Sequence, residues 1–167
     1  MKYDRYLLVI ILTAFVMPIL FYSCNSQKGL VSRTNSVIKK GYTKVDTIFQ
    51  FSNYSNQTDV IWYHDDSSMY VYIIKPYNVK KLHPIIAINS HPKSESIEKS
   101  FDNTFDKEDT CFQNMLDGTA ITMHIKNQQK KWSSLDVNCL FSKDYQPNTF
   151  AYKMKYDLSL IINQYYK

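Results

Sequence analysis

Hydrophobic and polar residues alternate in three stretches of the chain, which is the period of a β-strand with one buried face. The first stretch covers residues 45–51. The other two cover residues 120–126 and 132–141, and a polar turn at 127–131 joins them. This pattern predicts one strand near the start of the folded domain and a one-sided β-hairpin in its second half.

Two further stretches are apolar or aromatic on both faces. They cover residues 60–64 and 69–75, and the turn-forming cluster Asp65-Asp66-Ser67-Ser68 separates them. They predict a second β-hairpin, made of central strands that are covered by helices on one face. A connection at residues 77–81 then leads to a shorter strand predicted at 84–89.

Apolar residues recur every three or four positions in two regions, the spacing of a helix that packs on one side. In the middle region, the stripe is Ile97, Phe101, Phe105, Phe112, Met115 and Leu116, with Ser94 as a cap before it and Gly118 as a stop after it. In the last region, the stripe follows Pro147 and consists of Phe150, Met154, Leu158, Ile161 and Tyr165. The predicted fold is therefore α+β: a mainly antiparallel sheet of five or six strands, with a middle helical region and a C-terminal helix packed on it.

The first residues of the chain form a short basic and then apolar segment. Lys2 and Arg5 precede an uncharged run, whose apolar part at residues 7–21 has about the length of a signal-peptide core. It is short for a membrane-spanning helix, which needs roughly 20 apolar residues. The run ends at Ser23-Cys24, a small residue directly before a cysteine. This segment resembles the signal peptide and lipobox of bacterial lipoproteins.

The resemblance implies that the chain is cut between Ser23 and Cys24, and that Cys24 carries a diacylglycerol thioether as its membrane anchor. Two other interpretations remain open, a signal peptide cleaved without lipidation and a helix retained as an anchor. The expected organisation is a signal peptide at 1–23, the lipidated cysteine with a flexible polar tether at 24–44, and one domain at 45–167. No acidic cluster follows Cys24, which favours the periplasmic face of the cell envelope.

Composition narrows the classes of function. The chain has only 3 glycines, so it lacks the glycine clusters of phosphate-binding loops and of the nucleophile elbow of hydrolases. Its formal net charge of +5 is mild, and the charges are dispersed along the sequence. We therefore predict no nucleic-acid partner.

The cysteines predict a disulfide. There are 3 in the chain, and the lipobox uses Cys24. Cys111 and Cys139 remain as an even pair in a compartment that permits disulfides, so they are expected to be bonded to each other. The alternative is two buried free thiols, which behave as small hydrophobic groups.

The titratable residues predict no catalytic centre, no metal site and no cofactor. The 4 histidines, His64, His83, His91 and His124, lack the spacing of a zinc site. The acids at residues 102–109 lack the alternation and the glycine of a calcium loop. His124 is expected to point outward from its strand into solvent.

Aromatic residues are dense on and beside the central hairpin, at Trp62, Tyr63, Tyr70, Tyr72 and Tyr77. If one face of the hairpin is open, they form a platform for a protein or a sugar; the alternative is that the rings pack under helices. The expected function is a lipid-anchored, non-enzymatic envelope protein that binds another envelope protein, a toxin or a glycan. The alternative function is a small periplasmic hydrolase of envelope polymers, using His83 or His91 with a carboxylate.

Overall fold

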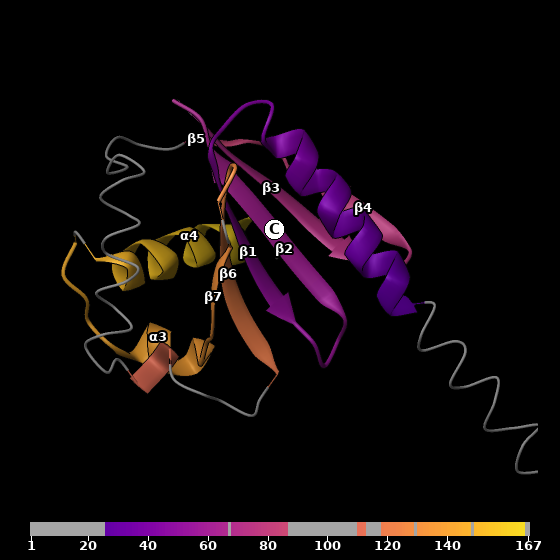
Figure 1. Cartoon of the computed structure of the whole chain (residues 1–167). Coiled ribbons are helices and arrows are strands. Elements are labelled where there is room, and N and C mark those ends of the chain that lie inside the picture. Colours follow the sequence, from indigo (N-terminus) through magenta and orange to yellow (C-terminus); the bar gives the residue numbers. More distant parts are fainter. Residues whose placement is uncertain are drawn as a thin grey trace, which may run out of the picture.

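The folded domain consists of one antiparallel sheet between two helices that run across its opposite faces (Figure 1). The computed structural model describes residues 26–66, 68–86, 110–112, 118–128, 130–147 and 149–165. The first helix occupies residues 26–41, and the last, α4, is Phe150–Tyr165. The predicted α+β class, with a C-terminal helix packed on a mainly antiparallel sheet, is confirmed.

Six strands run side by side in the order β4-β3-β2-β1-β6-β7, and the two-residue β5 pairs with the free end of β3. All pairs are antiparallel. The strands are β1 (Thr47–Asn53), β2 (Thr58–His64), β3 (Ser68–Lys75), β4 (Asn78–Lys81), β5 (Ile85–Ile86), β6 (Thr119–Ile125) and β7 (Lys131–Ser134). The described residues also include two short helical segments, the 3-10 turn η1 (Thr110–Phe112) and α3 (Val137–Ser142).

The sheet separates two hydrophobic cores, because successive side chains of a strand point to opposite faces. On the α4 face, rings and aliphatic groups from every long strand pack against the stripe Phe150, Met154, Leu158 and Ile161. On the other face, the helix at 26–41 covers a smaller core made of Ile38, Ile48, Ile61, Tyr63, Tyr72 and Ile74. The strands β2 and β3 are therefore buried on both sides, which explains their two-faced apolar pattern.

The prediction of a flexible tether at residues 24–44 is wrong for its described part. Residues 26–41 form a helix whose Leu30, Val37 and Ile38 belong to the smaller core. Serine, threonine and asparagine between these positions, with Gly29 and Gly41 on either side, conceal the helical period, and such a sequence would be a marginal helix in isolation. Packing on the sheet stabilises it, so the domain begins well before residue 45.

The predicted strand at 132–141 is too long. The strand β7 ends at Ser134, and Asp136 then caps α3 by accepting a hydrogen bond from the backbone N–H of Cys139 at 3.0 Å. An aspartate in this position satisfies the free amide groups of a helix start, and this local preference outweighs the alternating pattern. The connection expected at residues 77–81 contains the strand β4, whose four residues are all exposed.

Several predictions concern residues outside the described part of the chain. These are the signal peptide at 1–23, the lipid site Cys24, the helix starting at Ser94, and His91. Among the helices that the structure does describe, none is both long enough and apolar enough to cross a membrane.

Candidate functional site

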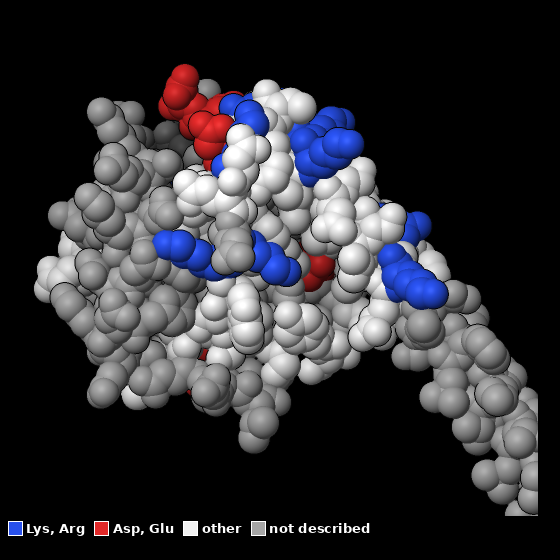
Figure 2. Space-filling view, viewed as in Figure 1, with Lys and Arg blue, Asp and Glu red and all other residues white. Residues whose placement is uncertain are grey.

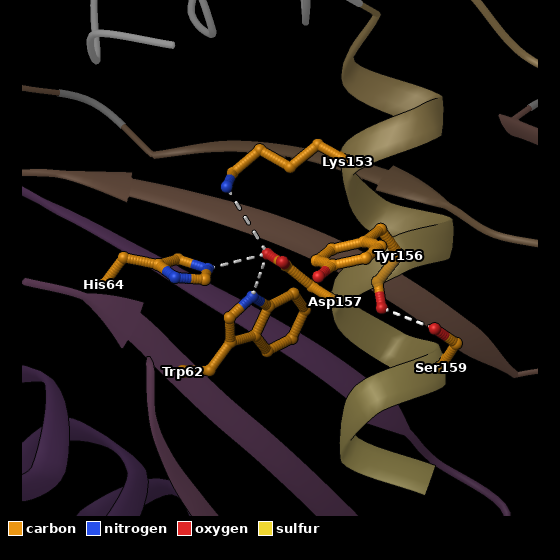
Figure 3. Close-up of polar contacts among 6 residues, drawn as sticks. All are labelled: Trp62, His64, Lys153, Tyr156, Asp157 and Ser159. Atoms are coloured by element: carbon orange, nitrogen blue, oxygen red, sulfur yellow. Dashed lines mark hydrogen bonds and ion pairs between the residues drawn. The ribbon is translucent and has the colours of Figure 1, made fainter. Parts of the chain in front are cut away.

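A carboxylate is buried between the sheet and α4, with three hydrogen-bond or ion-pair partners on one of its oxygens (Figure 3). The Nε1–H of Trp62 donates to Asp157 Oδ2 at 2.9 Å. The Nε2 of His64 lies at the same distance and must be the donor, because an ionised carboxylate only accepts. The ammonium of Lys153, one turn earlier in α4, lies 3.6 Å from the same oxygen.

Burial and charge act against each other in this cluster. Burial tends to raise the pKa of Asp157, but the hydrogen bond and charge of His64, the charge of Lys153 and the Trp62 hydrogen bond outweigh it, so the pKa is lowered. Burial lowers the pKa of Lys153, and the attraction of Asp157 compensates only in part. The carboxylate therefore stays ionised at neutral pH, held by its donors.

The cluster is enclosed within the protein. Asp157 is 0% exposed, and the side chains of His64 and Lys153 are 9% and 7% exposed. Among the described residues, the second oxygen of Asp157 has no hydrogen-bond partner. A group so enclosed fixes α4 to β2 and cannot reach a substrate in this conformation.

Sequence reasoning missed this cluster, although a signal was present. Lys153 and Asp157 are four residues apart and lie beside Met154 and Leu158, which belong to the buried stripe of the last helix. A lysine and an aspartate at this spacing on a packed face are expected to pair with each other.

On the opposite face of the sheet, polar side chains form a continuous chain of hydrogen bonds across three strands. His124 on β6 pairs with Gln50 Oε1 on β1 at 2.8 Å, and the Gln50 amide donates to Ser52 Oγ at 2.8 Å. Ser52 donates to Asp59 on β2 at 2.6 Å, and Thr34 of the helix at 26–41 donates to the other oxygen of Asp59 at 2.5 Å. These hydrogen bonds connect the part of the sheet face that the helix at 26–41 covers to the part that it leaves uncovered.

His124 does not sit freely in solvent as expected. Burial, followed by the charge of Lys130, lowers its pKa to about 4, although Asp59 acts in the other direction. The imidazole is therefore neutral at physiological pH. In that state its Nε2 donates to Gln50 Oε1, because the amide oxygen can only accept.

The part of this face formed by β1, β6 and β7 carries an exposed tryptophan. Trp132 is 66% exposed, faces Thr122 across the β6–β7 pair, and Thr122 in turn faces Gln50 on β1. We call Gln50, Thr122, His124 and Trp132 the open face, since no described helix covers Trp132. A large exposed ring beside the hydrogen-bonded Gln50 amide and His124 imidazole is suited to binding a polar partner.

The predicted aromatic platform on the central hairpin does not form. Trp62 is 0% exposed and faces α4, whereas Tyr63 and Tyr72, 1% and 9% exposed, lie in the smaller core on the other side. Tyr70 stacks on Tyr63 with ring centroids 5.3 Å apart. Only Tyr77, at 68%, is widely exposed. Two-sided burial of the hairpin thus places Trp62, Tyr63 and Tyr72 under helices, the alternative considered for the hairpin rings.

The predicted disulfide is present. The sulfur atoms of Cys111 and Cys139 lie 2.01 Å apart, and the bond joins η1 to α3. The hydroxyl of Tyr145 donates to Cys111 Sγ at 3.2 Å. Cys139 lies in a helix and not on the inward face of a strand, so the pairing was correct but the expected local structure was not.

The histidine proposed for a hydrolase is not part of a catalytic arrangement in the described residues. His83 is exposed, and its backbone carbonyl accepts a hydrogen bond from Gln164 at 2.9 Å. No described carboxylate pairs with its ring. His91, the other candidate, lies outside the described part of the chain.

Comparisons with known proteins do not place the chain in a family. No protein-family model matches it, and neither a curated protein nor a solved structure matches.

Proposed function

We propose that the protein is a lipid-anchored component of the bacterial cell envelope that binds a partner without catalysing a reaction. The partner class is another envelope protein, a toxin or a glycan, and the open face is the binding surface. The observation that carries this proposal is the 66% exposure of Trp132 within a row of polar side chains on one sheet face.

The surroundings of Trp132 support binding more than catalysis. Two half-buried polar side chains of the open face, Gln50 and His124, are fixed by the hydrogen bond between them. The most perturbed carboxylate, Asp157, is instead enclosed on the opposite face. Exposed tryptophans often dominate binding energy, because a large rigid ring is desolvated at little entropic cost.

The two tryptophans of the chain give a direct test of the open face. Trp62 is fully buried and Trp132 is exposed, so iodide should quench the fluorescence of Trp132 alone. A partner that covers the open face should protect Trp132 from iodide. Glycan fragments of the envelope and detergent-solubilised envelope proteins are the probes.

Trp132→Ala should weaken capture of the partner by about 30-fold, corresponding to a hot-spot loss of about 2 kcal/mol. Tyr54→Ala is the matched control, because Tyr54 is similarly exposed at 64% but lies in the β1–β2 turn. Equal capture by both variants would reject the open face. Turnover of envelope substrates by the purified protein would reject the non-enzymatic function and favour the hydrolase.

The anchoring part of the proposal has its own test at Cys24. Cys24→Ala should abolish incorporation of a labelled fatty acid and leave the domain folded, because Cys24 precedes every residue of both cores. Circular dichroism checks the fold. Labelled fatty acid entering the variant would exclude Cys24 as the site, and a wild-type chain that stays unlabelled and keeps its first residues would indicate an anchor helix.

A further inference from the structure

Two segments far apart in the sequence bring their lysines and arginines to one edge of the domain. Residues 26–44 and residues 75–84 contain no aspartate or glutamate. They lie side by side, because Arg33 Nη1 in the first helix donates to the backbone oxygen of Pro76 in the β3–β4 turn at 2.5 Å. We call the cations on the helix side of this edge the basic surface: Lys28, Arg33, Lys39, Lys40, Lys44 and Lys81.

The cations of the basic surface are available to a partner. All except the half-buried Arg33 are exposed, and none is ion-paired with a carboxylate of the described residues. Figure 2 shows Lys and Arg side chains along the helix side of this face, whereas most acidic side chains in the view gather at its upper left. The charges that are dispersed along the sequence are therefore clustered by the fold.

One aromatic ring holds two of these cations close to each other. Lys44 Nζ lies 4.7 Å from the centroid of Tyr70, and Lys81 Nζ lies 5.6 Å from the same centroid. The two lysines come from the end of the helical segment and from β4, so the ring joins the two halves of the surface. Asp65 raises the pKa of the Tyr70 hydroxyl through a hydrogen bond. Its negative charge offsets one of the lysine charges near Tyr70.

We propose that the basic surface docks on the anionic phospholipid headgroups of the membrane that holds the protein. This proposal rests on the envelope location proposed above and adds the surface and the lipid charge that orient the domain. Only Asn25 separates Cys24 from the described helix, so Cys24 and Ser26 are at most about 7 Å apart. An anchor at Cys24 therefore places the start of the basic surface at the membrane.

The length of the basic surface determines how the domain is oriented on the membrane. A helix of this length extends about 24 Å, whereas electrostatic attraction fades over about 8 Å at physiological ionic strength. A helix standing upright would leave Lys39 and Lys40 beyond reach of the headgroups. A helix lying along the membrane brings both its ends and β4 within reach, so we expect the second orientation.

Lysine footprinting on vesicles tests this docking. The full chain is reconstituted into phosphatidylcholine vesicles with or without phosphatidylglycerol, and the reactivity of each lysine toward an acylating reagent is measured by mass spectrometry. Lys39, Lys40, Lys44 and Lys81 should become about fivefold less reactive on the anionic vesicles, corresponding to about 1 kcal/mol per charge at the surface. Salt at about 1 M should remove this protection.

A pair of matched variants separates docking from mere proximity. Lys39→Gln with Lys81→Gln should weaken docking by about 30-fold, two charges at about 1 kcal/mol each, so Lys40 and Lys44 regain reactivity. Lys126→Gln with Lys130→Gln removes two exposed cations of the β6–β7 hairpin and should change nothing. Equal protection on neutral and anionic vesicles, or equal effects of both pairs, would overturn the proposal.

Two controls distinguish docking on anionic lipid from lipidation of Cys24 and from binding to other polyanions. The same footprint on Cys24→Ala, mixed with the vesicles, reports docking without acylation. Protection in this variant supports docking even if Cys24 is never acylated. Protection by a DNA duplex at lower phosphate concentrations than by anionic vesicles would assign the basic surface to nucleic acid instead and overturn the proposal.

Discussion

Asp157 carries its charge in fully buried surroundings. Its carboxylate is 0% exposed and has Trp62, His64 and Lys153 on a single oxygen. Removing a charge from water costs several kcal/mol, and only its donors offset that cost. The cluster therefore contributes little net stability as a whole, while the loss of one member is expensive.

Asp157→Asn should destabilise the domain by about 3 kcal/mol, because it leaves the buried ammonium of Lys153 without its counter-charge. Urea unfolding followed by circular dichroism measures the loss. Asp157→Leu combined with Lys153→Met removes both charges and should recover the part of the loss that is due to the unpaired ammonium, although Trp62 and His64 then lack their acceptor. A double variant as unstable as the single one would show that packing, and not charge, holds α4 at this point.

The exposed pair Asp46–Lys126 serves as a control for burial. Its nitrogen and oxygen are 3.7 Å apart, close to the 3.6 Å of Lys153–Asp157, but its side chains are 76% and 45% exposed. Asp46→Asn should therefore change the free energy of unfolding by less than about 1 kcal/mol.

His124 should make the protein sensitive to mild acid. With its folded pKa at about 4 and an ordinary value of 6.5, the unfolded chain binds a proton that the folded chain does not between these pH values. The free energy of unfolding should therefore fall as the pH drops from 6.5 to 4. Urea titrations of wild type and His124→Gln should show a flatter profile for the variant over this window.

Asp157 acts in a different pH window, which keeps the two effects distinct. Its pKa is lowered from 3.8, so its contribution is present above that value and is lost as the pH falls further. A His124→Gln profile as steep as that of the wild type would contradict the burial assigned to His124.

At the scale of elements, the helix at 26–41 shows how tightly secondary structure can depend on packing. Its residue Gly29 lies against the β3–β4 turn, where an added Cβ would stand 2.8 Å from the backbone oxygen of Pro76. Gly41 lies against the other end of the sheet, where a Cβ would meet Ile48 at 2.6 Å. Both glycines allow the helix to approach closely enough to cover the smaller core.

Gly29→Ala should destabilise the domain by about 1 kcal/mol. Alanine gains up to about 1 kcal/mol of helix propensity, but a collision with a backbone oxygen typically costs more, about 1–3 kcal/mol. Ser36→Ala, at an exposed position of the same helix, should stabilise by a few tenths of a kcal/mol. Thermal unfolding compares them, and a stabilised Gly29→Ala would disprove the close approach.

The sequence predicts helices and strands best where a single hydrophobic period dominates a stretch. The strands β1 and β6 alternate cleanly, and α4 keeps its apolar stripe over four turns, so each was predicted within a few residues. The α3 helix was missed because its capping residue, Asp136, falls on the polar side of the alternating pattern at residues 132–141 and so does not interrupt it. The short β4 has no buried residue and thus no pattern to detect.

At the scale of the whole molecule, the disulfide closes a loop between residues 28 positions apart. Reduction, or the double change Cys111→Ala and Cys139→Ala, should lower the free energy of unfolding by about 3 kcal/mol in the chain-entropy model. Urea unfolding with and without dithiothreitol measures it. Dithiothreitol should shift the urea midpoint of the wild type and leave that of the double variant unchanged. A shift in both proteins would show that the reductant acts elsewhere than on this disulfide.

Predicting the candidate sites required knowledge of the tertiary structure, more than predicting the helices and strands did. The disulfide could be predicted, because two cysteines remain once Cys24 is assigned. The open face could not, since it requires knowing that the helix at 26–41 covers Tyr63 and Tyr72 and leaves Trp132 exposed. The basic surface likewise depends on the contact between Arg33 and Pro76, which lie 43 residues apart.

The division of the interior into two cores has a consequence for the order of assembly. The smaller core draws only on residues between Leu30 and Ile74, whereas the larger one also needs the last helix up to Ile161. If the chain is exported as proposed, with its N-terminus first, it can complete the smaller core while its C-terminal half is still in transit. The other face, with Phe49 and Trp62, then stays uncovered until α4 arrives, and we expect holding chaperones to bind the emerging protein there.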